Sequence, residues 1–235
     1  MSDVVAEAVK VTDVDGVRTI TIDRPEARNA MTLEMRERIA KLFTNASDDD
    51  TVDVVAITGA DPSFSGGADL KEIRAGLPRQ CNPTVAVRAC AKPTIAAVNG
   101  VCVTGALELV LACDLVMASE RASFGDTHAK AGLMPGWGMS AALPAAVGQR
   151  KALELALTGT LVDAEEALRI GLVNHVVAHD ELLARTHELA QTIRANDRDA
   201  VRRQLALYRA GAGMPFDAAL VLEREAADAW RDRER

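Results

Sequence analysis

The sequence contains few aromatic residues, and this limits how a core can be built from it. Phe, Trp and Tyr together make up 3% of the 235 residues, whereas hydrophobic residues of all kinds make up 49%. A core of this composition must consist mainly of Ala, Val, Leu and Ile. The chain length is near the upper range for a single core, so we expect one large domain with at most a small appendage.

The sequence also lacks an excess of positive charge and a long hydrophobic run. Its net charge is −7 at pH 7, and this balance argues against a surface that binds nucleic acid. The first ten residues have neither the basic nor the apolar region of a secretory signal. The most apolar stretch, residues 101–113, is too short to cross a bilayer and contains Glu108. We therefore expect no nucleic-acid or membrane partner and a cytoplasmic location.

The spacing of cysteine and histidine predicts no metal site. The four cysteines, at residues 81, 90, 102 and 113, are not spaced as metal-binding pairs, so we expect reduced, mostly buried thiols. His175 and His179 are four residues apart, but their segment is typical of a strand followed by a loop, with no third ligand.

The first half of the chain alternates strands, loops and helices. Residues 8–23 predict two strands around a glycine turn, because apolar residues alternate on both sides of it. A helix is expected from about Thr32, and buried strands are expected at residues 51–59, 93–100 and 114–119. This order predicts an α/β layer structure whose loops gather at the strand ends.

The second half of the chain is mainly helical. One helix is expected to end at Gly159, and the next to begin with Asp163 as N-cap and Glu166 in the capping-box position. A short strand at residues 172–177 precedes further helices, which are expected from Asp180, from about Asp199 and across residues 215–230. We therefore divide the chain into an α/β core at residues 1–178 and a helical region at residues 179–235. The helical region is expected to support oligomerisation and to cover the functional site.

Two glycine-containing loops each follow a strand and open a helix. They are DPSFSGGADLKEI and NGVCVTGALEL. Glycine lets the backbone approach a ligand, and the first N–H groups of a helix are unpaired donors. Side by side, the two loops would direct two amides at one oxygen atom and form an oxyanion hole. The alternative is that these glycines only form tight turns. Neither loop matches a phosphate-binding motif, and the sequence has no G-x-S-x-G elbow.

Several short segments occur in the order and spacing of a known family. They are FSGGADLKE, KPTIAAVNG, GALELVLACD, FG, GLMPGWG, ALTG and A…GLV. Through them the chain resembles the crotonase superfamily, the enoyl-CoA hydratase/isomerase family, from RPEARNAM to about Val177. The resemblance implies a spiral of β-β-α units with carboxy-terminal helices that pack into homotrimers, commonly paired as hexamers. It also implies an acyl-CoA substrate, with coenzyme A as part of that substrate and no separate cofactor.

The resemblance also assigns roles to individual residues. Ala68 and Gly105 match the positions whose backbone N–H groups hold the thioester oxygen, while Thr104 and Ala106 replace glycines that many family members carry. The positions that match coenzyme A contacts are Arg28, Asp69, Leu70 and Lys71.

Glu108 matches the first catalytic glutamate of the family hydratases. It lies three residues after Gly105, among apolar residues, where an unpaired carboxylate is costly. This favours a role as general base, and the alternative is an interaction with the helix dipole.

His128 stands where the family hydratases carry their second glutamate, shortly after the FG pair. Asp126 is two residues away from that position and is only a weak candidate, because neither a helix nor a loop predicts that the two side chains point the same way. A histidine titrates near neutrality, with a pKa of about 6.5 in model peptides, so it suits proton transfer. The alternative is a surface or loop-stabilising side chain.

Three functions remain compatible with these residues. The first, which we favour, is a hydratase-like lyase in which Glu108 and His128 act on a 2-enoyl-CoA. The second is a double-bond isomerase that uses Glu108 alone. The third is a protein that binds acyl-CoA without turnover.

Overall fold

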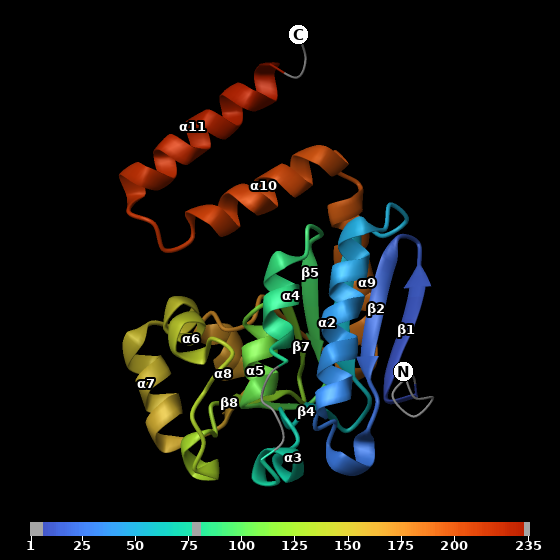
Figure 1. Ribbon diagram of the computed structural model, residues 1–235, viewed down its shortest axis with the longest axis vertical. Coiled ribbons are helices and arrows are strands. Elements are labelled where there is room, and N and C mark those ends of the chain that lie inside the picture. Colours follow the sequence, from blue (N-terminus) through green and yellow to red (C-terminus); the bar gives the residue numbers. More distant parts are fainter. Residues whose placement is uncertain (1–6, 77–80, 233–235) are drawn as a thin grey trace.

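The computed structural model describes residues 7–76 and 81–232, which form two β-sheets surrounded by helices (Figure 1). The larger sheet has the strand order β1-β2-β3-β5-β7-β10, and the smaller has the order β4-β6-β8-β9. The strands of the larger sheet are β1 (Val9–Val14), β2 (Val17–Ile22), β3 (Val54–Gly59), β5 (Thr94–Val98), β7 (Leu115–Ser119) and β10 (His175–Val177). Those of the smaller sheet are β4 (Ser63–Ser65), β6 (Val101–Val103), β8 (Ser123–Gly125) and β9 (Val162–Asp163).

The chain passes through both sheets in three similar turns. β3 joins the larger sheet, β4 joins the smaller one, and the short helix α3 (Leu70–Arg74) follows. The same order recurs in β5, β6 and α5 (Gly105–Val110), and again in β7, β8 and the 3₁₀ turn η2 (Ala129–Ala131). Corresponding strands of successive turns pair in parallel. The predicted spiral of β-β-α units is therefore confirmed.

The three-residue strands of the smaller sheet were not predicted. The segments of β4 and β6 were expected to be loops that lead from a strand straight into a helix, and no strand was expected at β8. Three residues are too few to show an alternation of apolar and polar side chains. Because β4, β6 and β8 are neighbours in one sheet, the loops that follow them also lie side by side.

Both faces of the larger sheet are covered by helices. On β3, Val55 and Ile57 belong to the main core cluster, which includes residues of α2 (Leu33–Asp48), whereas Val54 packs in a second cluster with Ala190 of α9 (Leu182–Arg194). Neighbouring residues of a strand point to opposite faces. The buried strands are therefore apolar throughout rather than alternating.

The predicted helix starts are confirmed at their caps. Thr32 Oγ1 accepts a hydrogen bond from the Met35 N–H at the start of α2, and Asp163 accepts from the Glu166 N–H at the start of α8 (Ala164–Arg169). The Glu166 side chain instead pairs with Arg169 and Lys151, so only one half of the capping box forms. The other helical segments are η1 (Pro25–Ala27), α4 (Pro83–Ala89), α6 (Met139–Val147), α7 (Gln149–Thr158), η3 (His179–Glu181), α10 (Arg198–Gly211) and α11 (Phe216–Asp232).

The region after residue 178 contains helices of two kinds. α9 packs on the larger sheet, whereas α10 and α11 form an arm beyond the rest of the chain (Figure 1). Arg209 ties α10 to the core, because its guanidinium donates to Asp114 at 2.6 Å and to the Cys90 carbonyl at 2.6 Å. The prediction that residues 179–235 form one oligomerisation and cover region stays a prediction.

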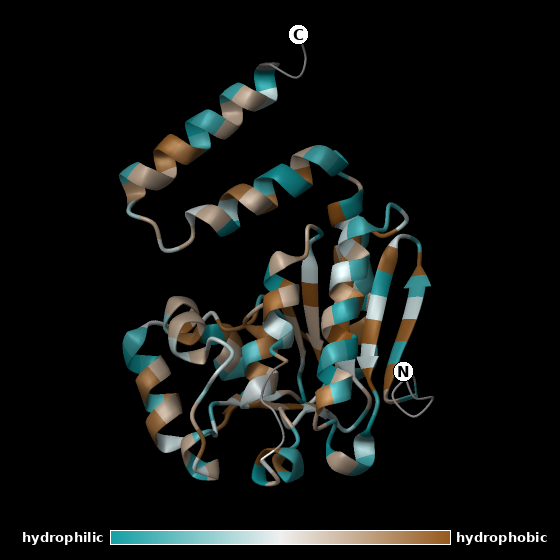
Figure 2. Cartoon of the chain, in the orientation of Figure 1, coloured by the Kyte–Doolittle hydropathy of each residue, from teal (hydrophilic) through white to brown (hydrophobic). Residues whose placement is uncertain are grey.

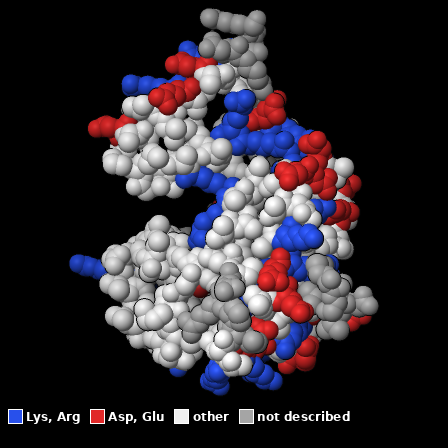
Figure 3. Space-filling view, in the orientation of Figure 1, with Lys and Arg blue, Asp and Glu red and all other residues white. Residues whose placement is uncertain are grey.

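The arm leaves apolar side chains without cover. Figure 2 shows hydrophobic segments on both α10 and α11, and Tyr208, Phe216 and Val221 are exposed. Figure 3 shows a deep notch between the arm and the core, with Lys and Arg side chains at its back.

Candidate active site

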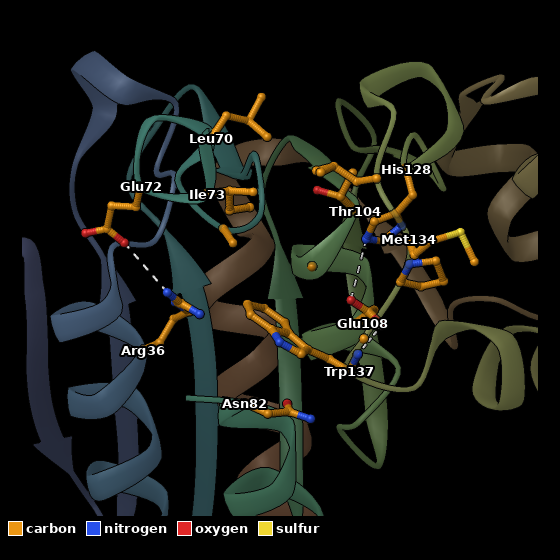
Figure 4. A pocket seen from close by; sticks show the side chains of 15 residues that line it. Arg36, Leu70, Glu72, Ile73, Asn82, Thr104, Glu108, His128, Met134 and Trp137 are labelled. Carbon is orange, nitrogen blue, oxygen red and sulfur yellow. Dashed lines mark hydrogen bonds and ion pairs between the residues drawn. The ribbon is translucent and has the colours of Figure 1, made fainter. Parts of the chain in front are cut away.

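A cavity of about 220 Å³ opens beside the loops that follow β4, β6 and β8 (Figure 4). Its lining residues come from α2, from α3 and α5 with the loops that precede them, from the N-cap of α4, and from the segment between β8 and α6. They are Arg36, Ala68, Leu70, Glu72, Ile73, Asn82, Thr104, Gly105, Glu108, His128, Leu133, Met134, Pro135, Gly136 and Trp137.

The first glycine loop is held from both sides of Ala68. The Met31 N–H donates to the Gly67 carbonyl at 2.8 Å, and the Asp69 N–H donates to the Met31 carbonyl at 2.9 Å. Nearby, the buried Asn29 donates to the Ala60 and Ser63 carbonyls, so the segment that carries Met31 is itself anchored. Among the hydrogen bonds of the described residues, none uses the N–H of Ala68. This N–H is a free donor in the wall of the cavity.

The second glycine loop lies against the first. Gly105 is the first residue of α5, so its N–H has no partner within the helix. The preceding Thr104 has a φ of 53°, a left-handed value that is unfavourable for a β-branched residue. Its hydroxyl donates to the Gly66 carbonyl at 3.0 Å, which joins the two loops. A Cβ on Gly67 would collide with the Thr104 side chain, so only glycine permits this approach.

Glu108 is buried, and one of its carboxylate oxygens is occupied. Oε1 accepts from the N–H of Trp137 at 2.7 Å and from that of Met139, the first residue of α6, at 3.0 Å. Oε2 lies 3.7 Å from Nε2 of His128. The two amides therefore fix the orientation of the carboxylate and leave Oε2 beside the histidine.

His128 is buried and not a surface side chain, since only 7% of it is exposed. Its Nδ1 lies 2.6 Å from Oδ1 of Asp126, and its backbone N–H donates to the same oxygen at 3.2 Å. Burial of Asp126 opposes ionisation, but the hydrogen bonds from His128 outweigh it and lower the pKa of Asp126 below its ordinary value. The two side chains do point the same way, because the Asp126 carboxylate folds back on the backbone two residues on, as in an Asx turn.

The structure does not bring every predicted contact residue to the cavity. Arg28 and Lys71 are exposed and outside its lining. Asp69 is buried, and its carboxylate accepts from Arg24 at 2.6 Å and from the Lys71 N–H at 2.8 Å, so it caps α3. Burial raises the pKa of Asp69, but these two hydrogen bonds outweigh it and the net pKa is lowered. Of the positions matched to coenzyme A contacts outside the oxyanion hole, only Leu70 lines the cavity.

Some residues of the cavity were missed in the sequence. Trp137 packs against Gly105 and forms part of the wall, and the guanidinium of Arg36 lies 5.6 Å from the centre of its ring. Arg36 also pairs with Glu72 at 3.6 Å. Of Trp137 and Arg36, only Trp137 had a sequence signal, because it lies within GLMPGWG. Arg36 lies on an ordinary amphipathic helix, where a charged residue is expected to face solvent.

The chemistry that this arrangement permits is acid–base catalysis next to a polarised carbonyl. Two free N–H groups from adjacent loops can hold an oxyanion, and Glu108 and His128 supply two proton-transferring groups beside them.

The described residues, 7–76 and 81–232, contain no group of three His, Cys, Asp or Glu side chains that could hold a metal ion. No helix in this part of the chain is long and apolar enough to cross a membrane. The four cysteines are free in the structure.

Comparison with known proteins identifies the family. The sequence model of the enoyl-CoA hydratase/isomerase family matches residues 12–230. A curated relative from Arabidopsis thaliana, named "Probable enoyl-CoA hydratase 1, peroxisomal", is 37% identical over 220 residues, or 92% of this chain and 83% of the relative. The crotonyl-CoA hydratase of Syntrophomonas wolfei is 35% identical over 214 residues, or 87% of this chain and 82% of the relative.

A solved structure gives the same result. The crystal structure of an enoyl-CoA hydratase from Mycobacterium avium has a TM-score of 0.82 and 43% identity, covering 97% of this chain and 98% of its own. The family match, the relatives and the shared fold agree with the geometry of the cavity. The chain belongs to the enoyl-CoA hydratase/isomerase family, the crotonase superfamily.

Proposed function

We propose that this protein hydrates a 2-enoyl-CoA thioester. The observation that carries the proposal is the position of Glu108 and His128 side by side in a cavity that also presents the free N–H groups of Ala68 and Gly105. In this assignment the thioester oxygen accepts from both N–H groups. Negative charge that develops there is stabilised, and an enolate becomes accessible.

The two side chains then have complementary tasks. Glu108 removes a proton from water as the water oxygen bonds to Cβ, and the His128 imidazolium gives a proton to Cα. The proton on Glu108 returns to His128 across the gap of 3.7 Å between Oε2 and Nε2. The net change is the addition of one water molecule, and the enzyme ends in its starting protonation state. The hydratase names of the relatives support this reaction.

The two other hypotheses do not require both Glu108 and His128. An isomerase needs only Glu108, and a protein that only binds acyl-CoA needs neither acid nor base. The burial of His128 beside Glu108, with its other ring nitrogen on Asp126, favours the two-group reaction. Coenzyme A is part of the substrate in this proposal. Arg28 and Lys71 are proposed to meet its charged end from outside the cavity.

Replacement of His128 tests the two-group reaction. His128→Ala is expected to lower kcat for 2-enoyl-CoA hydration by about a hundredfold with little change in KM, because the lost proton transfer belongs to the transition state. The pH–rate profile of the variant should also differ in shape from that of the parent, because one of the two proton-transferring groups is gone. His128→Glu should retain more activity than the alanine variant, because it supplies a second carboxylic acid.

The matched control is His175→Ala, which removes an exposed histidine of β10. It should leave kcat and the profile unchanged. Superimposable profiles for the parent and His128→Ala would leave Glu108 as the only proton carrier and favour the isomerase hypothesis.

We also propose that the chain forms a homotrimer or a dimer of trimers and acts in the cytoplasm. The exposed apolar residues of α10 and α11, such as Tyr208 and Phe216, support an interface there. Light scattering at micromolar concentration is expected to give at least three times the mass of the 25.0 kDa chain. Tyr208→Glu with Phe216→Glu should lower the measured mass, and a monomeric parent would contradict the proposal.

A further inference from the structure

His128 has two carboxylates around it, and the proposed function uses only one of them. Nδ1 lies 2.6 Å from Oδ1 of Asp126, whereas Nε2 lies 3.7 Å from Oε2 of Glu108. Asp126 is 3% exposed and sits on the side of the ring away from Glu108. Asp126 does not line the cavity that contains Glu108, although it lines a neighbouring cavity together with His128. In the cavity of Glu108 it can act only through the ring of His128.

The hydrogen bond at Nδ1 decides which nitrogen of a neutral histidine carries the proton. A carboxylate accepts hydrogen bonds and cannot donate them, so the short contact places a proton on Nδ1 when Asp126 is ionised. The lowered pKa of Asp126 is consistent with that charge state. Nε2 is then the nitrogen that gains and loses a proton, and it faces Glu108 and the cavity (Figure 4).

We propose that Asp126 is a positioning residue that holds His128 with its proton on Nδ1, so that Nε2 is presented to the substrate and stabilised when it is protonated. This inference rests on the proposed function, since it explains how a histidine serves in place of the second glutamate. Asp126 contacts His128 at two points. Its Oδ1 meets the ring at Nδ1, and it accepts the backbone N–H of the same residue at 3.2 Å.

No other charged group named around His128 accepts a hydrogen bond from its Nδ1. Glu108 meets the opposite nitrogen, and Arg36, in the same cavity, is paired with Glu72. Lys130 directs its side chain toward Gly159. The α6 residues that line a neighbouring cavity with His128 carry no charge; they are Met139, Ser140, Leu143 and Pro144.

Asp126→Asn tests the proposal because it keeps the size of the side chain and removes its charge. The variant is expected to lower kcat by about a hundredfold with little change in KM. Without the carboxylate, the ring loses the acceptor that keeps the proton on Nδ1 and presents Nε2 to the substrate. Asp126→Glu, which restores the carboxylate, should recover part of the activity.

Two comparisons separate positioning from a general loss of structure. In a chain that already carries His128→Ala, Asp126→Asn should cause no further loss of kcat, since Asp126 acts through the ring. Asp163→Asn makes the same chemical change at a carboxylate that also accepts a backbone N–H, but at the start of α8. This control should match the parent in kcat and pH profile.

The protonated nitrogen can be measured without any turnover. In protein with ¹⁵N-labelled histidine, one of the four histidine signals is assigned to His128 by its absence from His128→Ala. At a pH where the ring is neutral, the parent should carry its proton on Nδ1, and Asp126→Asn should lose this preference.

A parent with the proton on Nε2 would overturn the inference, and so would an Asp126→Asn variant as active as the parent. If His128→Ala abolishes hydration while Asp126→Asn does not, the positioning role fails and the proposed function stands. If the parent hydrates no 2-enoyl-CoA, the proposed function and the catalytic part of this inference fail together, whatever the tautomer.

Discussion

Glu108→Gln is expected to lower kcat for hydration by about a hundredfold or more and to leave thioester affinity nearly unchanged. The amide has the size of the carboxylate and keeps one oxygen, which can still accept from the N–H groups of Trp137 and Met139. The variant should therefore fold normally, but it has lost the base. Steady-state kinetics on one 2-enoyl-CoA, with a binding measurement on a non-reactive saturated acyl-CoA, separate the two effects.

Two further variants make this test specific. Glu108→Ala removes the acceptor as well as the base, so two buried N–H groups lose their partner, at a cost of about 1–3 kcal/mol each in the free energy of unfolding. Thermal melting should show this loss for the alanine variant and not for the glutamine variant. Glu154→Gln, on the exposed side of α7, is the matched control and should behave as the parent. Full activity of Glu108→Gln would place the base elsewhere.

Ala68→Pro is expected to lower kcat by about 100- to 1,000-fold, the effect of losing one oxyanion-hole donor. Proline removes the N–H without adding charge. The hydrogen bonds that hold the loop use Gly67, Asp69 and Met31 and are not made by the Ala68 N–H. The residue before the proline would be Gly67, which tolerates the restriction that proline imposes on its predecessor.

Ala68→Gly is the matched control for this prediction. It retains the N–H and removes only a methyl group, so its kcat should stay close to that of the parent. Circular dichroism and melting should show that Ala68→Pro is folded. A folded Ala68→Pro variant with parental kcat/KM on every active thioester would contradict the oxyanion assignment.

The organisation of the core could be predicted from the sequence because it depends on local patterns. The buried strands at residues 54–59, 94–98 and 115–119 are continuous apolar runs bounded by turns, and the caps Thr32 and Asp163 are local signals. The short strands of the smaller sheet were missed, because pairing between distant segments stabilises them and no local pattern does.

The candidate site divides in the same way. The sequence by itself determined which groups are available: two strand-to-helix glycine loops, a glutamate in an apolar helix start and a histidine at the position of a second acid. Their proximity was inferred only through the family resemblance, because Ala68 and His128 are sixty residues apart in the chain.

Only the tertiary structure decided how these groups are oriented. The smaller sheet brings the loops together, Trp137 and the first residue of α6 supply the amides that hold Glu108, and the turn after β8 folds Asp126 onto His128. The hydrogen bonds of Glu108 join its side chain to the backbone of another segment, and the contact of Asp126 with His128 depends on φ and ψ within one turn. Residue types and spacing do not specify those angles, so the hydrogen bonds that orient Glu108 and His128 were settled by the packed fold.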